Sequence, residues 1–288
     1  MALCVLLSLP LQGEQDSATS VFRGGVQMVG ISLTVRGQDG HLVTALSADD
    51  FRLFVDGRPV AIDLYSNEAR PLAVAVLFST VRGELLPRTR AVGDALLGAL
   101  DDEDVATIGS YANEVAVGPA LTADKRTLRR ALNEELWPGW GNPVATAVDG
   151  GRALVASSTA KRAVVVIGSD LRDSCIGGAP CVTVPSAIAS LSRAEVMVYG
   201  LWLRDPPGAP SDRPVRRMAY ETGGGYAEVA DDADLAATMA RVVDELRHEY
   251  LIGFVPIVRD DRRHDLRVEV ARPGLVTRAR RTFRMLAP

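Results

Sequence analysis

Apolar runs and helical patterns alternate through the middle of the chain. Residues 72–78 are uninterruptedly apolar, which is typical of a strand buried on both faces of a sheet. A small polar loop that begins Ser79-Thr80 follows, and a helical pattern continues over residues 87–100. A second buried strand is predicted at residues 163–167. Together these patterns predict a mostly parallel, Rossmann-like doubly wound α/β domain at residues 70–248.

Other elements of this domain follow from the same patterns. Helices are expected at residues 122–136, 144–157, 182–193, 213–222 and 230–250, and strands at residues 105–112, 114–121 and 196–203. Thr122 is the predicted N-cap of the first of these helices. Because ligands bind at the carboxyl edge of such sheets, residues 79–84 are expected to border any site.

Alternating strand patterns and turn signals lie on both sides of this domain. Strands are predicted at residues 26–35, 42–43, 52–55, 60–65, 251–258, 266–270 and 276–283, with turns at Gln38-Asp39-Gly40 and Asp56-Gly57. Neither group of strands makes a stable sheet by itself. We therefore expect residues 20–68 and 251–288 to pair as one small antiparallel β unit, with the α/β domain inserted in it.

Four short stretches occur in an order that is typical of one family. They are residues 46–57 (LSADDFRLFVDG), 220–225 (YETGGG), 246–254 (LRHEYLIGF) and 272–281 (RPGLVTRARR). In these the chain resembles the bacterial secreted "VWFA-related" proteins, which contain a von Willebrand factor A-type domain. The resemblance implies a non-enzymatic adhesion or assembly module. It also implies a divalent-metal site built from an Asp-x-Ser-x-Ser loop, a Thr and an Asp, which a partner carboxylate completes.

The sequence departs from this metal-binding pattern. Ser79, Val81 and Gly83 stand at the three positions of the first loop, Pro143 stands at the Thr position, and only Asp170 is retained. The neighbouring Arg82 adds a positive charge that opposes a bound cation. An oxygen from Thr146 or Ser169 would need a shifted geometry. We therefore expect a degenerate metal site and no cofactor.

The candidate partner-binding residues lie in the loops at the carboxyl edge. They are Ser79, Thr80, Arg82, Trp137, Trp140 and Asp170. Tryptophan is enriched among interface hot spots, but both tryptophans could equally pack beneath their loop. Asp170 has three interpretations, as a remaining ligand, as a partner of Arg82, or as a cap.

Two other functions stay open. A hydrolase could use a Ser79–Asp170 cleft, although none of the histidines His41, His248 and His264 is expected at the carboxyl edge. A structural component of an envelope complex would bind its partner through the β unit instead.

Composition and cysteines bear on location. The 288 residues carry a formal net charge of −4, which argues against a general nucleic-acid binder. Residues 1–13 resemble a signal-peptide remnant, or else a buried strand, and no other segment is expected to cross a membrane. Cys175 and Cys181 predict a disulfide in an exported protein, whereas in a cytosolic chain they would be two free thiols. We expect a secreted, periplasmic or envelope protein with an unknown protein partner.

Overall fold

The computed structural model of the chain describes most of its length. The described residues are 21–23, 26–78, 86–111, 115–117, 120–135, 142–155, 160–168, 182–203, 213–229, 234–257, 260 and 262–284. Within these ranges no helix combines the length and apolar character needed to span a bilayer.

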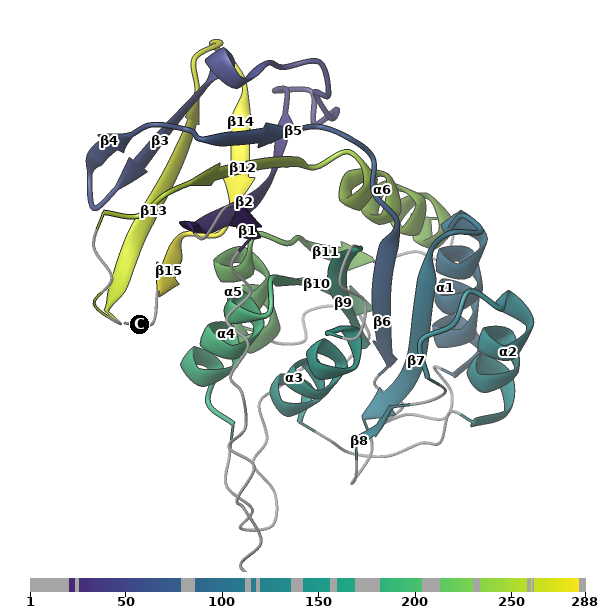
Figure 1. Ribbon diagram of the computed structural model, residues 1–288. Helices are drawn as coiled ribbons and strands as arrows, with labels where there is room; N and C mark the ends of the chain where they lie inside the picture. Colours follow the sequence, from purple (N-terminus) through teal and green to yellow (C-terminus); the bar gives the residue numbers. More distant parts are fainter. Residues whose placement is uncertain are drawn as a thin grey trace, which may run out of the picture.

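A parallel sheet forms the centre of the molecule (Figure 1). Its strands are β6 (Leu72–Phe78), β7 (Val105–Tyr111), β8 (Val115–Val117), β9 (Lys161–Gly168), β10 (Val196–Leu203) and β11 (Tyr226–Val229). Their order is β11-β10-β9-β6-β7-β8, and only the edge strand β8 runs antiparallel to its neighbour. Every residue of β6, β9 and β10 is buried. For β6 and β9 this confirms the buried strands expected from their apolar runs.

Helices cover both faces of this sheet. They are α1 (Leu86–Ala99), α2 (Lys125–Arg130), α3 (Pro143–Leu154), α4 (Val184–Arg193), α5 (Arg213–Thr222) and α6 (Leu235–Arg247). Alternate residues of β6 divide between two cores. Leu72, Val74, Val76 and Phe78 share one core with α1, α2 and α6, and Ala73, Ala75 and Leu77 share the other with α3, α4 and α5. The sheet is therefore doubly wound, as predicted.

Two of the predicted helix boundaries are wrong. The N-cap of α2 is Asp124, whose carboxylate accepts hydrogen bonds from Arg126 N (3.0 Å) and the Thr127 hydroxyl (2.6 Å). Thr122 cannot take that role because its backbone forms a β-bridge with Ala106. The closing helix α6 ends at Arg247 and not at residue 250, because His248 is its C-cap and Tyr250 begins the next strand; residues 230–233 lie outside the described part of the chain.

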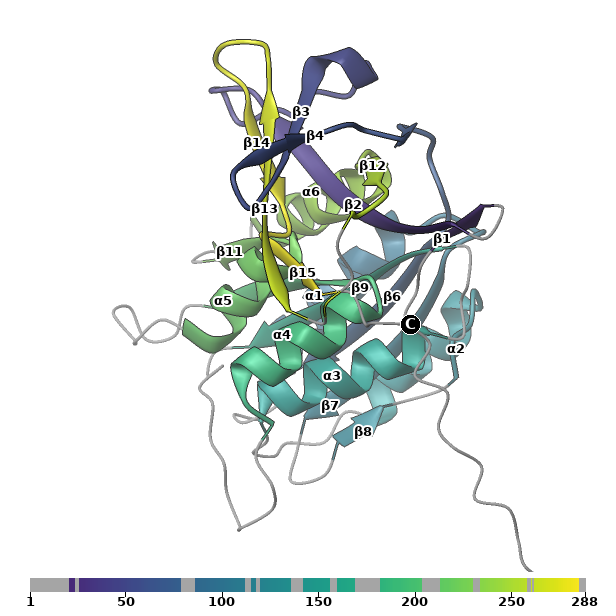
Figure 2. The same ribbon diagram turned by 60° about the vertical axis from the view of Figure 1, so that its left-hand side comes forward.

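The strands from the two ends of the chain pair with each other (Figure 2). They are β1 (Val21–Arg23), β2 (Val26–Arg36), β3 (Phe51–Val55), β4 (Arg58–Val60), β5 (Leu64–Ser66), β12 (Tyr250–Phe254), β13 (Arg263–Val270), β14 (Val276–Ala279) and β15 (Thr282–Arg284). One sheet has the order β1-β2-β12-β5, with β14 also on β2, and the other has the order β15-β13-β3-β4. Both sheets therefore combine strands from before and after the α/β domain, and their facing side chains form a third core.

The expected single strand at residues 276–283 is instead two strands in different sheets. β14 pairs with β2, whereas β15 pairs with β13. Arg280 and Arg281 lie between them, where the chain passes from one sheet to the other. Arg281 O accepts a hydrogen bond from Leu266 N (2.7 Å), and the Arg280 side chain turns toward the α/β domain.

Candidate functional site

The predicted binding residues at the carboxyl edge fall outside the described part of the chain. This holds for Ser79, Thr80, Arg82, Trp137, Trp140 and Asp170, and also for Cys175 and Cys181. Their role as a partner site and the predicted disulfide therefore stay predictions. The strands and the helix that lead into these loops are described.

The strand ends bring the first and third loops of the predicted site to one place. Phe78, the last residue of β6, is paired with Ile167 of β9 and with Ser110 of β7. The first loop follows Phe78, and the third follows Gly168 at the end of β9. The attachment points of the two loops are therefore neighbours on adjacent parallel strands.

Helix α3 follows the second loop of the predicted site. Asn142 is its N-cap, and the Asn142 side-chain oxygen accepts hydrogen bonds from Val144 N (2.8 Å) and Ala145 N (3.3 Å). Pro143 is the first residue of the helix, where a missing N–H is tolerated. The buried Thr146 hydroxyl donates to Asn142 O (2.9 Å). Thr146 thus acts within the helix, where its hydroxyl proton is already used.

A second polar region lies at the opposite, amino-terminal edge of the sheet, where the α/β domain meets the β unit. Lys161, the first residue of β9, is 4% exposed. Its ammonium group donates to Leu246 O (3.1 Å), Arg247 O (3.0 Å) and Glu249 O (3.1 Å). Lys161 therefore caps the carboxyl end of α6, where the last carbonyls have no partner in the helix.

Glu245 connects α6 to the β unit through ion pairs between its buried carboxylate and two partly exposed arginines. One carboxylate oxygen accepts from Arg36 of β2 (2.7 Å), and the other is paired with Arg278 of β14. The Thr34 hydroxyl also donates to Glu245 (3.4 Å). The carboxylate is 4% exposed, so its three partners compensate for the loss of water around it.

The buried phenol of Tyr199 extends this network. Its hydroxyl lies 3.4 Å from Glu245 Oε1 and 3.4 Å from Glu249 Oε1, and Arg278 donates to it at 3.3 Å. Burial raises the pKa of the Tyr199 phenol, so the hydroxyl keeps its proton and can donate. Burial likewise raises the pKa of the Glu249 carboxyl to about 8.

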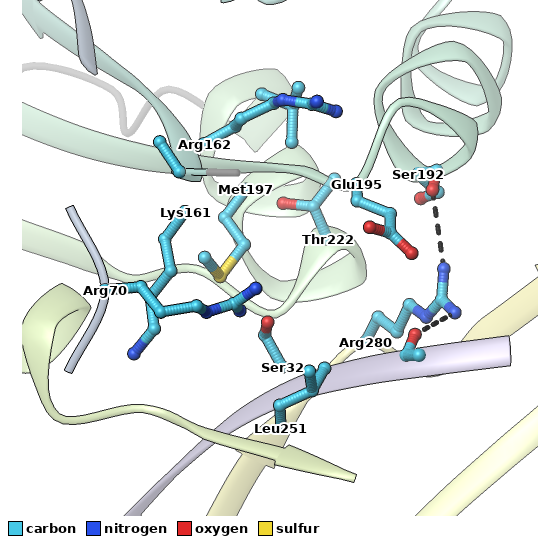
Figure 3. Close-up of a pocket in the computed structure, with 13 residues that line it drawn as sticks. Ser32, Arg70, Lys161, Arg162, Ser192, Glu195, Met197, Thr222, Leu251 and Arg280 are labelled. Carbon is cyan, nitrogen blue, oxygen red and sulfur yellow. Dashed lines mark hydrogen bonds between the residues drawn. The ribbon is translucent and has the colours of Figure 1, made fainter. Parts of the chain in front are cut away.

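A cavity of about 80 Å³ opens beside this network (Figure 3). Arg70, Lys161, Arg162 and Arg280 line it, and Glu195 is the carboxylate among its described lining residues. Its walls come from both parts of the molecule, since Ser32 and Leu251 belong to the β unit and Met197 and Thr222 to the α/β domain. We call it the joint cavity.

Sequence patterns gave little indication of this region. Its residues are far apart in the sequence. Lys161 and Glu249, for example, are 88 positions apart. One available signal was that the chain has only two lysines, and that Lys161 directly precedes a buried apolar run. A charged residue at the start of such a run needs buried partners.

Residues in three of the four stretches that suggested the resemblance make structural contacts, either against β10 or within the β unit. Thr222 in the second stretch accepts from Val198 N (2.9 Å) and donates to Met218 O (2.8 Å). Gly224 lies so close to β10 that a Cβ atom there would be 2.0 Å from Val198 O. Arg272 in the fourth stretch makes two hydrogen bonds with Asp50 in the first (2.8 and 3.0 Å).

Comparison with known proteins gives the class of this fold. No protein-family model matches the chain, and no curated protein matches it. Solved structures do match. BatB from Bacteroides thetaiotaomicron is 15% identical with a TM-score of 0.50, and the match covers 61% of this chain and 98% of that one.

Two further structures extend this comparison. A von Willebrand factor type A protein from Catenulispora acidiphila is 9% identical with a TM-score of 0.50, over 92% of this chain and 76% of that one. Proximal thread matrix protein 1 from the mussel byssus, in a form with a zinc-occupied MIDAS motif, is 11% identical with a TM-score of 0.50, over 65% of this chain and 48% of that one. The chain therefore contains a von Willebrand factor A-type fold, as the resemblance predicted. These matches concern the fold alone.

Proposed function

We propose that this chain is a non-enzymatic protein-binding module that contacts a partner through the loops at the carboxyl edge of its A-type domain. The module acts in adhesion or assembly, in a secreted, periplasmic or envelope location. The observation that carries the proposal is the pairing of Phe78 with Ile167, which places the starts of two candidate loops on adjacent parallel strands. Sheets of this kind bind their ligands at that edge.

The proposed binding does not use a metal. Ser79, Val81, Gly83 and Pro143 replace four of the five oxygen ligands expected in such a domain. The large aromatic side chains of Trp137 and Trp140 would supply the affinity that the metal supplies elsewhere, because tryptophan contributes strongly at interface centres.

A pull-down from the native envelope tests this proposal. The double variant Trp137→Ala/Trp140→Ala should lose the partner that the wild-type protein captures. The matched control is Ile257→Ala/Val276→Ala, which removes two apolar side chains of the β unit that are 94% and 64% exposed. The control should keep the partner.

Other outcomes would favour the other functions. Loss of the partner in the control alone would favour a structural component that binds through the β unit. Labelling of Ser79 by a broad serine-reactive probe would favour a hydrolase.

A further inference from the structure

The joint cavity is lined by several basic side chains, and two of them have hydrogen-bond donors without an acceptor among the described residues. Arg70 lies on the segment that leads from the β unit into β6, Arg162 lies at the start of β9, and Arg280 lies between β14 and β15. Glu195 is the carboxylate on the described walls. Arg70 and Arg280 thus bring guanidinium groups to the cavity from two separate segments, whereas Arg162 donates a hydrogen bond to Ala194 O (3.0 Å) (Figure 3).

Glu195 does not neutralise these arginines by direct contact. It interacts electrostatically with Arg280, Arg162 and Arg70. Within the described part of the chain, however, it forms no ion pair within 4.0 Å and no hydrogen bond through its carboxylate. The cavity lies between these charges, and burial raises the pKa of the Glu195 carboxyl. A protonated Glu195 would add a hydrogen-bond donor to the walls.

Two arginine side chains that line the cavity have hydrogen-bond donors without an acceptor among the described residues. Arg280 donates to Gly30 O and to Ser192 O (3.4 Å), but its buried Nε finds no partner in the described residues. Arg70 makes no hydrogen bond to any residue of the described ranges, and Figure 3 shows its guanidinium group directed into the cavity. An unsatisfied buried N–H destabilises the folded protein, and a bound acceptor would remove this cost.

The backbone at Glu195 is unusual in a way that favours a role for its side chain. Its φ is 53°, in the left-handed region where a helix usually ends with glycine. Glu195 directly precedes β10 and carries its carboxylate across the joint, so that a Cβ atom on Gly30 would lie 3.4 Å from Glu195 Oε1. Such strain concentrates at sites where the side chain is needed.

We propose that the joint cavity binds a small tetrahedral oxyanion of the phosphate or sulfate class. Guanidinium groups match such oxyanions through paired N–H donors. The cavity volume of about 80 Å³ is several times the 10–15 Å³ that one water needs by the same measure, so an oxyanion fits with a few waters. The bound anion bridges Arg70 and Arg280 and so fastens the A-type domain to the β unit. This proposal is independent of the loops at the carboxyl edge.

Calorimetric titration with inorganic phosphate, and separately with sulfate, tests the proposal in chloride buffer of constant ionic strength. Wild-type protein should bind one anion per chain, and its melting midpoint should rise with anion concentration because the anion binds only the folded state. Arg70→Gln should weaken binding about tenfold or more, which corresponds to loss of one charge-assisted hydrogen bond. Arg58→Gln, which changes an exposed arginine of β4, is the matched control and should bind as the wild type does.

A further variant and the possible negative results complete the test of anion binding. Glu195→Gln should bind phosphate as tightly as the wild type or more tightly, with the difference growing as pH rises and Glu195 loses its proton. Absence of heat and of a midpoint shift in the wild type would overturn the proposal. So would equal binding by Arg70→Gln, which would indicate an adventitious ion only, or binding to vesicles that contain phosphatidic acid without binding of free phosphate.

Discussion

Replacement of Glu249 by glutamine tests whether a neutral carboxyl group lies at the joint. Glu249 is 1% exposed, and its Oε2 atom has no hydrogen-bond partner among the described residues. Its Oε1 atom has one long contact with the Tyr199 hydroxyl. Burial raises the pKa of the carboxyl to about 8 in spite of the attraction of Lys161. We therefore expect the folded protein to hold Glu249 protonated at neutral pH.

Lys161 responds to the same burial in the opposite sense, because desolvation lowers the pKa of its ammonium group. Its three N–H groups nevertheless all donate to carbonyl oxygens, which favours the charged form. Glu249 has no comparable set of donors. We therefore expect Glu249 to take up the proton while Lys161 remains charged.

The direction of the pH dependence follows from the different pKa values of Glu249 in the unfolded and the folded protein. An unfolded glutamate loses its proton near the ordinary pKa of 4.5, whereas folded Glu249 keeps it up to about 8. Between these values the folded state binds more protons, so the free energy of unfolding falls as pH rises. The stabilisation is complete below the unfolded pKa and is lost as pH rises through the folded pKa. Within this window, the free energy of unfolding falls by ~1.4 kcal/mol for each pH unit when one proton is involved.

Urea unfolding at several pH values measures this effect. Relative to Glu249→Gln, the wild type should lose on the order of 2 kcal/mol of unfolding free energy between about pH 5 and about pH 7. Glu134→Gln, at an exposed position, should follow the wild type. The buffer should contain no phosphate, because the joint cavity is its proposed site. Parallel curves for the wild type and Glu249→Gln would refute the reasoning and show an ionised carboxylate at the joint.

Three further predictions concern the metal, the cysteines and the two ends of the chain. Melting in chelator and in millimolar Mg²⁺ should give one midpoint, and an upward shift in Mg²⁺ that Asp170→Ala abolished would contradict a degenerate metal site. Mass spectrometry of unreduced exported protein should show Cys175 and Cys181 as a bonded pair, two hydrogens lighter than the reduced form, and two alkylatable thiols would exclude it. Deletion of residues 251–288 should make the N-terminal strands sensitive to protease while residues 70–248 stay resistant, because β2 loses both β12 and β14. Continued protection of the N-terminal strands would show that they fold independently.

Local sequence patterns predicted the bounds of those strands and helices that end at a clear change of residue type. Strand β10 and helix α5 have the predicted bounds, because an apolar run defines the strand and Gly223, with φ of 88°, ends the helix. The end of α6 was predicted too late because the apolar residues of β12, which begins at Tyr250, follow the helix almost directly. The N-cap was misplaced because Thr122 and Asp124 are both good caps, and only the β-bridge to Ala106 decides between them.

The contacts between the α/β domain and the β unit could not be predicted in the same way, because they join residues that are far apart in the sequence. Arg36 meets Glu245, and Gly30 meets Arg280, across more than 200 positions. No periodic pattern carries such information. The pairing of the terminal strands was predictable only in outline, from the fact that each group of strands needs partners.

The four stretches that carry the family resemblance therefore describe the internal packing of the molecule more than they describe the binding loops. Thr222 and Gly224 fix α5 against β10, Arg272 holds Asp50, and Glu249 lies buried next to Lys161. Each of these features requires particular residue types for packing or for pairing of buried groups. A sequence can keep all of them while its carboxyl-edge loops change freely, because none of these contacts involves those loops. The resemblance is accordingly evidence for the architecture, whereas our proposal assigns the partner contact to loop residues such as Trp137 and Trp140, which substitution experiments can test one at a time.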